Sequence, residues 1–306
     1  MSMTHPRTGR PRERVLTMRG IGKRFGAVKA LTDVDFWVNE GEVVALVGDN
    51  GAGKSTLVKV LAGVHPPDSG SIEFDGEEVG IDSPADAQQL GIETIFQDLA
   101  LCDNLDVVAN LWLGRELRDG ATLDEVDMEQ RTWTLLRELS AKIPSVRVPV
   151  ASLSGGQRQT VAIARSLIGE PRVVILDEPT AALGVAQTAE VLNLIERLRE
   201  RGHGVILISH NMADVMAVAD RVVVLRLGRN NGVYNVADVT SETLIAAITG
   251  AVDHSAAPRR VPERTDAAPD SARDDDPAAQ TSGGTVIRMP RAGSRRTPRP
   301  RGDGSR

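Results

Sequence analysis

The stretch Gly48-Asp49-Asn50-Gly51-Ala52-Gly53-Lys54-Ser55-Thr56 decides the fold, because it carries every part of the phosphate-binding pattern G-x-x-x-x-G-K-[ST]. Its glycines allow consecutive backbone N–H groups to turn inward around a phosphate. Lys54 is placed to reach the β- and γ-phosphates of a nucleotide, and the hydroxyl of Ser55 can ligate Mg²⁺. The residues expected to contact the nucleotide in this loop are Gly48, Asn50, Gly51, Gly53, Lys54, Ser55 and Thr56.

The segments on both sides of this loop have the patterns that a phosphate-binding loop needs. Residues 42–47 (EVVALV) read as a buried strand, and residues 55–61 (STLVKVL) open a helix. The N-terminus of a helix presents free N–H groups and the positive end of the helix dipole, which favours a phosphate. The alternative, a glycine-rich turn that binds nothing, does not account for a strand and a helix at these positions.

Composition limits the class of protein. The chain has 306 residues, 41% apolar and 25% charged, which is ordinary for a soluble domain of about this size. The net charge of −6 argues against a domain that binds nucleic acid as a whole, and one cysteine, Cys102, excludes an internal disulfide framework. No run of 18 apolar residues suggests a membrane span, and the basic N-terminus lacks the apolar segment of a secretory signal. We therefore expect a cytosolic chain whose membrane role, if any, comes through a partner.

The rest of the chain predicts an α/β fold. Short β-branched runs predict buried strands at 43–47, 173–176, 205–208 and 222–225. Helical patterns such as residues 187–201 separate them, which favours a mostly parallel sheet covered on both faces. Alternating patterns at 15–18, 30–38 and 70–74 predict an antiparallel sheet near the N-terminus. Residues 99–164 have little strand signal and predict an inserted helical region.

Changes of composition predict the domain limits. Residues 1–13 are expected to form a disordered basic arm, and residues 14–252 the folded domain. Residues 253–306 have almost no bulky apolar side chains, so we expect a disordered charged tail. The tail is acidic over 263–276 and arginine-rich over 288–306. It is either a solvated extension or a segment whose basic end contacts anionic lipid, nucleic acid or its own acidic stretch.

Two acidic residues end one of the buried strands, in the sequence Val173-Val174-Ile175-Leu176-Asp177-Glu178. Asp177 can hold Mg²⁺ beside Ser55. The carboxylate of Glu178 can polarise the water that attacks the γ-phosphate. A solvated strand end would look similar if the phosphate-binding loop were absent, but the loop favours the catalytic interpretation.

Two further motifs fit nucleotide chemistry. Leu153-Ser154-Gly155-Gly156-Gln157 opens a helix that Ser154 can cap, which provides a second helix N-terminus for an anion. Alone, it would be an ordinary capped helix. Ile208-Ser209-His210 follows another buried strand, where the histidine can hydrogen-bond the γ-phosphate and hold the attacking water. The other histidines, His5, His65, His203 and His254, are interpreted as structural.

Taken together, these motifs resemble the nucleotide-binding subunit of an ABC transporter over about residues 14–250. Residues 153–157 match the family signature, and Gln97, in Ile95-Phe96-Gln97, matches the glutamine of the Q-loop. Phe25, in Lys23-Arg24-Phe25-Gly26, matches the aromatic residue that stacks on adenine. The resemblance implies a P-loop ATPase core with a mostly parallel sheet, an antiparallel β-subdomain and a helical subdomain at about 99–164.

The resemblance also implies roles for individual residues. It makes Glu178 the catalytic glutamate, His210 the switch histidine, and Gln97 a residue that approaches Mg²⁺ and faces the membrane subunit. The catalytic set is then Lys54, Gln97, Glu178 and His210, and the magnesium ligands are Ser55, Gln97 and Asp177. The expected nucleotide contacts outside the loop are Phe25, Ser154, Gly155, Gly156 and Gln157.

One position departs from the family pattern. An aspartate usually follows the Ala/Ser-Ala/Ser-Leu triplet of the D-loop, whereas here Ala181-Ala182-Leu183 is followed by Gly184. That position usually helps to link two cassettes, so its loss puts the coupling of the two ATP sites in doubt. Lys54 and the catalytic residues remain, and we still expect hydrolysis.

The partners follow from the resemblance. ATP lies between the phosphate loop of one cassette and the signature of another, so a homodimer is expected, with two membrane-spanning permease subunits seated near Gln97. Residues 110–116, 178–184 and 208–212 are similar to those of carbohydrate importers of the ribose, xylose and fructose group. The implied function is an ATPase, with ATP and Mg²⁺ as cofactors, that energises monosaccharide uptake from the cytoplasmic face of the membrane. An extracytoplasmic sugar-binding protein would deliver the substrate through the permease, and no nucleic acid is expected as a partner.

Three alternatives stay open. The chain could be a soluble ABC ATPase that acts on nucleic acid or ribosomes, although it has no coiled-coil insertion and its net charge is acidic. It could be an importer subunit for a solute other than a sugar. It could also be a regulatory cassette that binds ATP without hydrolysing it, for which Gly184 argues weakly and Glu178 and His210 argue against.

Overall fold

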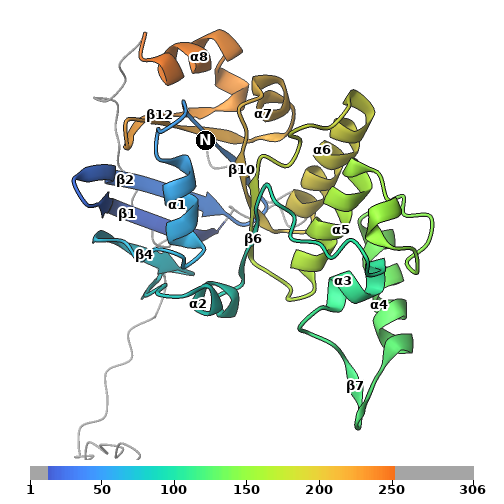
Figure 1. Ribbon diagram of the computed structural model, residues 1–306. Helices are drawn as coiled ribbons and strands as arrows, with labels where there is room; N and C mark the ends of the chain where they lie inside the picture. Colours follow the sequence, from blue (N-terminus) through green and yellow to red (C-terminus); the bar gives the residue numbers. More distant parts are fainter. Residues whose placement is uncertain (1–12, 252–306) are drawn as a thin grey trace, which may run out of the picture. The chain divides into compact units, whose positions relative to one another are not determined.

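The computed structural model describes residues 13–251. The predicted charged tail (253–306) and all but the last residue of the predicted basic arm (1–13) lie outside these residues. The described part contains a six-stranded sheet, a four-stranded sheet, a two-stranded hairpin and helices α1 to α8. Figure 1 shows how these elements are arranged.

The six-stranded sheet is the centre of the fold, with the strand order β12-β11-β3-β10-β9-β6. Its strands are β3 (Val43–Val47), β6 (Ile92–Ile95), β9 (Val173–Asp177), β10 (Gly204–Ile208), β11 (Arg221–Arg226) and β12 (Arg229–Asn235). All neighbours pair in parallel except β11 and β12. Every residue of β3 and β10 is buried, because both faces of the sheet are covered. This confirms the predicted α/β fold with a mostly parallel sheet.

A second, antiparallel sheet lies on one side of the central sheet, with the order β2-β1-β4-β5. It contains β1 (Arg14–Phe25), β2 (Val28–Asn39), β4 (Ser69–Phe74) and β5 (Glu77–Val79). One hydrophobic core joins residues of this sheet, such as Phe36, to Leu46 of β3 and Leu57 of α1 (Lys54–Leu61). Figure 1 shows α1 beside β1 and β2. The helix that follows the phosphate-binding loop is therefore held from both sheets.

The other face of the central sheet is covered by helices. Helices α5 (Gly155–Leu167), α6 (Val185–Glu200), α7 (Met212–Val218) and α8 (Ser241–Thr249) lie next to it. Farther from the sheet, α3 (Val107–Trp112) packs on α5 and α4 (Glu125–Glu138) packs on α3 (Figure 1). A second core joins Val43 and Val174 of the sheet to Leu111, Ile163 and Ile195 of three of these helices. The remaining helix, α2 (Pro84–Gln89), precedes β6, and single 3-10 turns occupy Val150–Ser152 and Val236–Asp238. Within residues 13–251, no helix has the length and apolar character needed to span a membrane.

The predicted helical insertion (99–164) contains α3, α4 and α5, but the structure differs in one detail. A short hairpin, β7 (Arg118–Asp119) and β8 (Thr122–Leu123), lies between α3 and α4. Asp119-Gly120 is a turn signal, and Gly120 has a φ of 61°. Each strand has only two residues, all of them exposed, so the sequence has no alternation of apolar residues from which these strands could be predicted.

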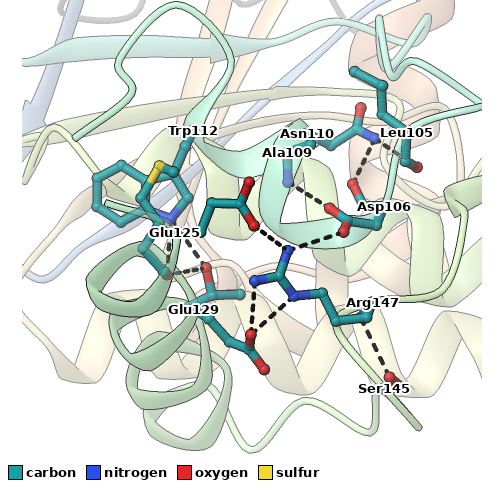
Figure 2. Close-up of polar contacts among 11 residues, drawn as sticks. Leu105, Asp106, Ala109, Asn110, Trp112, Glu125, Glu129, Ser145 and Arg147 are labelled. Carbon is teal, nitrogen blue, oxygen red and sulfur yellow. Dashed lines mark hydrogen bonds and ion pairs between the residues drawn. The ribbon is translucent and has the colours of Figure 1, made fainter. Parts of the chain in front are cut away.

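Arg147 holds the first two helices of this region together (Figure 2). Its guanidinium lies 2.8 Å from Glu129 and 3.4 Å from Glu125, both on α4. It also lies 3.5 Å from Asp106, whose carboxylate accepts the N–H of Ala109 as the N-cap of α3. One cation therefore links three carboxylates from two helices.

A buried ion pair connects the two sheets. Arg221 at the start of β11 donates to Glu42, just before β3, at 2.8 and 3.1 Å. The same guanidinium donates to the carbonyl of Trp37 in β2 at 2.9 Å and lies 4.2 Å from the centre of the Trp37 ring. The side chains of Arg221 and Glu42 are only 6% and 2% exposed, so this contact is shielded from water.

Candidate functional site

Three predicted segments meet at one edge of the central sheet. The carboxyl ends of parallel strands lie at the same edge, which is where open α/β sheets bind ligands. The register places Ile208 of β10 opposite Leu46 of β3 on one side and Asp177 of β9 on the other. The glycine-rich loop, the Asp177-Glu178 pair and His210 follow these strand ends, so the register brings them together.

The glycine-rich loop needs glycine for space as well as for backbone conformation. Gly53 has a φ of 106°, and a Cβ there would lie 2.9 Å from the carbonyl oxygen of Ala30. A Cβ at Gly48 would lie 2.3 Å from the carbonyl oxygen of Leu225. The loop is thus packed against β2 and β11, and any side chain at these two positions would push it outward.

The side chain of Lys54 folds back over its own loop. Its ammonium group donates to the carbonyl of Gly48 at 2.7 Å and to that of Asp49 at 3.1 Å. These two bonds hold a positive charge at the rim of the loop, beside the N-terminus of α1. A positive charge at a helix N-terminus is an arrangement that suits a polyphosphate.

Asp177 and Glu178 form an acidic pair at the end of β9. Burial raises the pKa of Asp177, and the negative charge of Glu178 raises it further, whereas Lys54 and Lys59 act in the opposite direction. A cation near Asp177 would stabilise its charged form. Glu178 has a left-handed φ of 52°, and its N–H donates to the carbonyl of Ile208 at 2.9 Å.

Glu178 and His210 are in direct contact. Nδ1 of His210 lies 2.7 Å from Oε2 of Glu178, although the two residues are 32 positions apart in the sequence. The Glu178 side chain is 17% exposed, whereas that of His210 is 76% exposed. The contact therefore joins a sheltered carboxylate to an imidazole that faces solvent.

These residues line a cleft of about 580 Å³. Its lining comprises Gly48, Asp49, Asn50, Lys54, Glu178, Ser209, His210, Met212, Ile245 and Ile248. The sequence predicts neither the last three as site residues nor Asp49 and Ser209, which lie inside predicted motifs. Met212 opens α7, and Ile245 and Ile248 belong to α8, whose apolar pattern gives no sign that it borders the cleft.

A second hollow, of about 550 Å³, lies on the other side of the glycine-rich loop. Gly51, Gly53, Ser55 and Thr56 line it from the loop and α1. Val28, Lys29 and Ala30 of β2 and the Leu227-Gly228 turn complete it. None of these five was predicted; Leu227-Gly228 carries only the glycine signal of a turn.

Besides the Ser154–Gln157 motif, three predicted residues line neither hollow: Asp177, at the end of β9 next to Glu178, and the more distant Phe25 and Gln97. Phe25 ends β1 and is 43% exposed, with its ring 5.2 Å from that of His65 in an edge-to-face contact. Gln97 is exposed two residues after β6, the strand that pairs with β9. β6 is an outer strand of the central sheet, so Gln97 emerges at the same edge as Asp177 without reaching the cleft.

The segment that follows Gln97 is held by a buried amide. Asn110, which is fully buried on α3, accepts the N–H of Cys102 at 2.7 Å and donates to the Cys102 carbonyl at 3.0 Å. Arg165 of α5 also donates to the carbonyls of Leu99 and Ala100, each at 2.8 Å. The single cysteine is half-buried within this fixed segment.

The Ser154–Gln157 motif lies elsewhere in the chain. Ser154 is the N-cap of α5, and its hydroxyl accepts the N–H of Gln157 while Gln157 accepts the N–H of Ser154. Gln157 also donates to the carbonyl of Lys142 at 3.0 Å and lines a hollow of about 240 Å³ between α4, α5 and α6. The structure does not bring this motif into either hollow beside the glycine-rich loop.

The position that departs from the family pattern begins α6. Gly184 is its N-cap without a capping side chain, and Val185 beside it is 91% exposed. If Gly155 had a Cβ atom, that atom would lie 3.0 Å from the side chain of Leu183, the residue before Gly184. A Cβ atom on Gly156 would lie 3.0 Å from the side chain of Gln187. The start of α6 therefore supports the glycines of the Ser154–Gln157 motif.

Comparisons with known proteins agree on one family. The family model described as ABC transporter matches residues 31–181. The xylose/arabinose import ATP-binding protein of Sulfolobus acidocaldarius is 47% identical over 215 residues, which cover 70% of this chain and 86% of that protein. The fructose import ATP-binding protein of Rhizobium meliloti is 45% identical over 247 residues, 78% of this chain and 95% of that protein.

Other relatives are longer. A ribose import ATP-binding protein of Rubrobacter xylanophilus is 43% identical over 246 residues, and this chain spans only 49% of its length. Among solved structures, an ATP-binding cassette of an ABC transporter in its ADP conformation superposes with a TM-score of 0.66 at 26% identity. The match covers 77% of this chain and 95% of that structure.

Proposed function

The chain belongs to the ABC transporter family of ATP-binding proteins, and from that premise we propose that it hydrolyses ATP to energise monosaccharide import across the cytoplasmic membrane. The observation that carries this proposal is the cleft in which Lys54, Glu178 and His210 meet. It offers a cation for phosphate charge and, facing the same space, a sheltered carboxylate that is hydrogen-bonded to an imidazole. The same chain supplies a second helix N-terminus at Ser154 for a partner's nucleotide.

The donor set beside the loop fits Mg²⁺ carried with the nucleotide. Among residues 13–251, no three His, Cys, Asp or Glu side chains converge as a metal site of their own. Mg²⁺ in nucleotide sites is commonly held by one or two protein oxygens together with phosphate oxygens. Asp177 and Ser55 would offer such oxygens beside the loop, Gln97 would add its carbonyl oxygen from the end of β6 outside the cleft, and Mg²⁺ would neutralise phosphate charge there. Burial, and after it the negative charge of Glu178, raise the pKa of Asp177, and a cation at this position would offset both.

The residues of the cleft divide the hydrolysis step between them. Glu178 accepts a hydrogen bond from the attacking water and polarises it toward the γ-phosphorus. His210 donates to Glu178 through Nδ1 and thereby fixes the direction of its carboxylate. Lys54 and the N–H groups of the loop stabilise the charge that develops as the bond between the γ-phosphorus and the bridging oxygen breaks. ADP and inorganic phosphate are the products.

A second copy of the chain would complete the site. The Ser154–Gln157 motif lines neither hollow of its own chain, so one copy leaves the exposed side of the γ-phosphate without the second set of donors. A two-fold dimer would place each motif over the other copy's loop. The exposed Val185 beside Gly184 would then lie near the contact between the copies.

The names of the relatives support the class of solute. The two relatives that the chain spans almost fully are named as xylose/arabinose and fructose import proteins. By that likeness, the partners are two membrane-spanning permease subunits and an extracytoplasmic sugar-binding protein, and the chain sits at the cytoplasmic face of the membrane. Gln97 and the fixed segment after it would meet the permease.

The first test is a phosphate-release assay on the purified chain with ATP and Mg²⁺. Glu178→Gln is expected to lower turnover at least about a hundredfold while ATP binding persists and a dimer accumulates. Glu200→Gln, on the exposed end of α6, is the matched control and should keep the parental rate. Parental turnover in Glu178→Gln would disprove the role of Glu178, and a parent that binds ATP without releasing phosphate would favour a regulatory cassette.

The second test concerns the solute. A strain that lacks the gene is expected to lose uptake of one or more labelled monosaccharides, and the parental gene should restore it while the Glu178→Gln gene should not. Loss of uptake of another solute class, with all sugars unaffected, would favour a non-sugar importer. Unchanged uptake throughout would favour a soluble ATPase that works apart from transport.

A further inference from the structure

A buried carboxylate close to the cleft has no role in the mechanism above. Asp214 is the third residue of α7 and is only 6% exposed. Its Oδ2 accepts a hydrogen bond of 2.7 Å from the hydroxyl of Thr180. Burying a carboxylate costs free energy unless the carboxylate gains hydrogen bonds. The bond from Thr180 therefore offsets part of the cost of burying Asp214.

Thr180 belongs to the turn that presents Glu178. This turn has two residues with left-handed backbones, Glu178 at a φ of 52° and Ala182 at 61°. Such conformations cost free energy and persist only where their surroundings hold them. Threonine is branched at Cβ and therefore stiff, so a bond to its hydroxyl also fixes the backbone at position 180.

Asp214 belongs to the element that carries His210. Helix α7 follows His210 directly: Asn211 is its N-cap and accepts the N–H of Ala213 at 3.0 Å. The N–H of Asn211 donates to the hydroxyl of Ser209, which is buried. His210 is thus joined to a short, capped helix whose first turn holds Asp214.

The two contacts run side by side between the same two segments. His210 meets Glu178 at 2.7 Å at the cleft, and Asp214 meets Thr180 at 2.7 Å. Neither Thr180 nor Asp214 lines the cleft, whereas Glu178 and His210 both do. The Thr180–Asp214 contact can therefore influence the reaction only through the Glu178–His210 contact.

We propose that Thr180 and Asp214 are a pair of positioning residues that hold Glu178 and His210 at hydrogen-bond distance during ATP hydrolysis. The proposal rests on the proposed function, because it assigns the pair to the hydrolytic step. The bond keeps the Glu178 turn and helix α7 in register. Without it, the carboxylate and the imidazole lose their common alignment while the phosphate-binding loop is unaffected.

The test separates turnover from binding. Thr180→Val keeps the shape of the side chain and removes the hydroxyl. Its kcat is expected to fall about ten- to a hundredfold, the effect of a small misplacement at a reacting centre, whereas KM and affinity for ATP stay within about twofold. Thr180→Ser restores the hydroxyl and should recover most of the lost kcat. Thr134→Val is the matched control, because its hydroxyl bonds only the carbonyl of Gln130 on the exposed side of α4.

A double-mutant cycle strengthens the test. Asp214→Leu, which keeps the approximate shape of the side chain and cannot accept a hydrogen bond, is combined with Thr180→Val and compared with each single variant. A pair that acts as one unit predicts that the double variant loses no more kcat than Thr180→Val alone. The single variant Asp214→Leu also decides the case if Thr180→Val does not fold: a lowered kcat at constant KM supports the pair, and a parental kcat overturns it.

The outcomes are distinct. A Thr180→Val variant with parental kcat, or one that loses ATP affinity together with kcat, overturns the positioning role. A parent that neither binds nor hydrolyses ATP contradicts the proposed function itself, whatever the variants do.

Discussion

At position 53, both the backbone conformation and the packing around it require glycine. Its left-handed φ disfavours a side chain, and the carbonyl of Ala30 leaves no room for one. Gly53→Ala is therefore expected to weaken ATP binding at least about tenfold, since forcing alanine into this conformation costs about 1–2 kcal/mol before the clash is counted. Isothermal titration with ATP and Mg²⁺ measures the effect.

The control for this variant is Gly120→Ala. Gly120 also has a left-handed φ, of 61°, but a Cβ there would meet no atom within 4 Å. It lies in the β7–β8 hairpin, away from the loop, so ATP affinity should stay parental. Equal affinities for parent and Gly53→Ala would show that the loop yields to a side chain.

At the residue scale, the sequence predicts which side chains approach the nucleotide better than it predicts their contacts. Lys54, Asp177, Glu178 and His210 stand out because each lies at or shortly after the end of a buried strand. The contact between His210 and Glu178 depends on the pairing of Ile208 with Asp177, which no local pattern contains. Their roles in the reaction remain predictions, as does the placement of adenine on Phe25.

Among the structural elements, α3 and α4 depend on Arg147 for their mutual position. Removing its charge leaves Asp106, Glu125 and Glu129 close together without a cation. Because Arg147 is 42% exposed, Arg147→Ala should lower the free energy of unfolding by only about 0.5–1 kcal/mol. Denaturation in low and high salt tests this: salt screens the repulsion, so the loss should shrink as salt rises.

Arg131→Ala is the matched control for Arg147→Ala. Arg131 pairs with Asp127 one turn away on the exposed side of α4 and joins no second helix. Because this pair is exposed to water, its loss should leave the stability close to the parental value. An Arg147 variant as stable as the Arg131 variant at low salt would contradict the linking role.

The junction of α6 and β10 predicts a dependence on pH. His203 donates through Nδ1 to the carbonyl of Pro171, and burial lowers its pKa below the ordinary value of 6.5. Below pH about 6.5 His203 therefore binds a proton more readily in the unfolded chain than in the folded chain. This contribution to stability is present above pH 6.5 and is lost as the pH falls toward the folded pKa.

The measurement compares His203→Gln with the parent. The parent's free energy of unfolding should fall as the pH drops from about 7 to 5, and His203→Gln should flatten part of that slope. Chemical denaturation at a series of pH values gives both curves. Parallel curves would mean that another group is responsible.

At the element scale, strong patterns were predictable and weak ones were not. The four predicted strands of the central sheet are confirmed by β3, β9, β10 and β11, because buried parallel strands leave continuous apolar runs. The β7–β8 hairpin leaves no such run. The border of the cleft on α8 was missed, because Ile245 and Ile248 look like any other apolar positions of a helix.

For the whole molecule, the Arg221–Glu42 pair joins both sheets and predicts a large effect. Glu42→Ala would leave a buried guanidinium without its carboxylate and should lower the free energy of unfolding by about 3–5 kcal/mol. Urea denaturation measures this. Glu73→Ala, which breaks the half-exposed pair with Arg19, should cost less than about 1 kcal/mol, and equal losses would contradict the buried pair's importance.

The order of strands in the sheet could not be predicted from local sequence patterns. Residues 43–47 precede 205–208 by more than 150 positions, yet β3 and β10 are neighbours in the sheet. Sequence patterns predict two kinds of sheet and a helical insertion, but which strands pair is determined by packing between segments far apart in the chain.

The lone thiol of Cys102 offers an experimental convenience. It is half-buried in a segment that Asn110 keeps rigid, next to the surface where a membrane partner would sit. A maleimide dye would attach at one known place without engineered cysteines, so its emission could follow assembly of the transporter in real time.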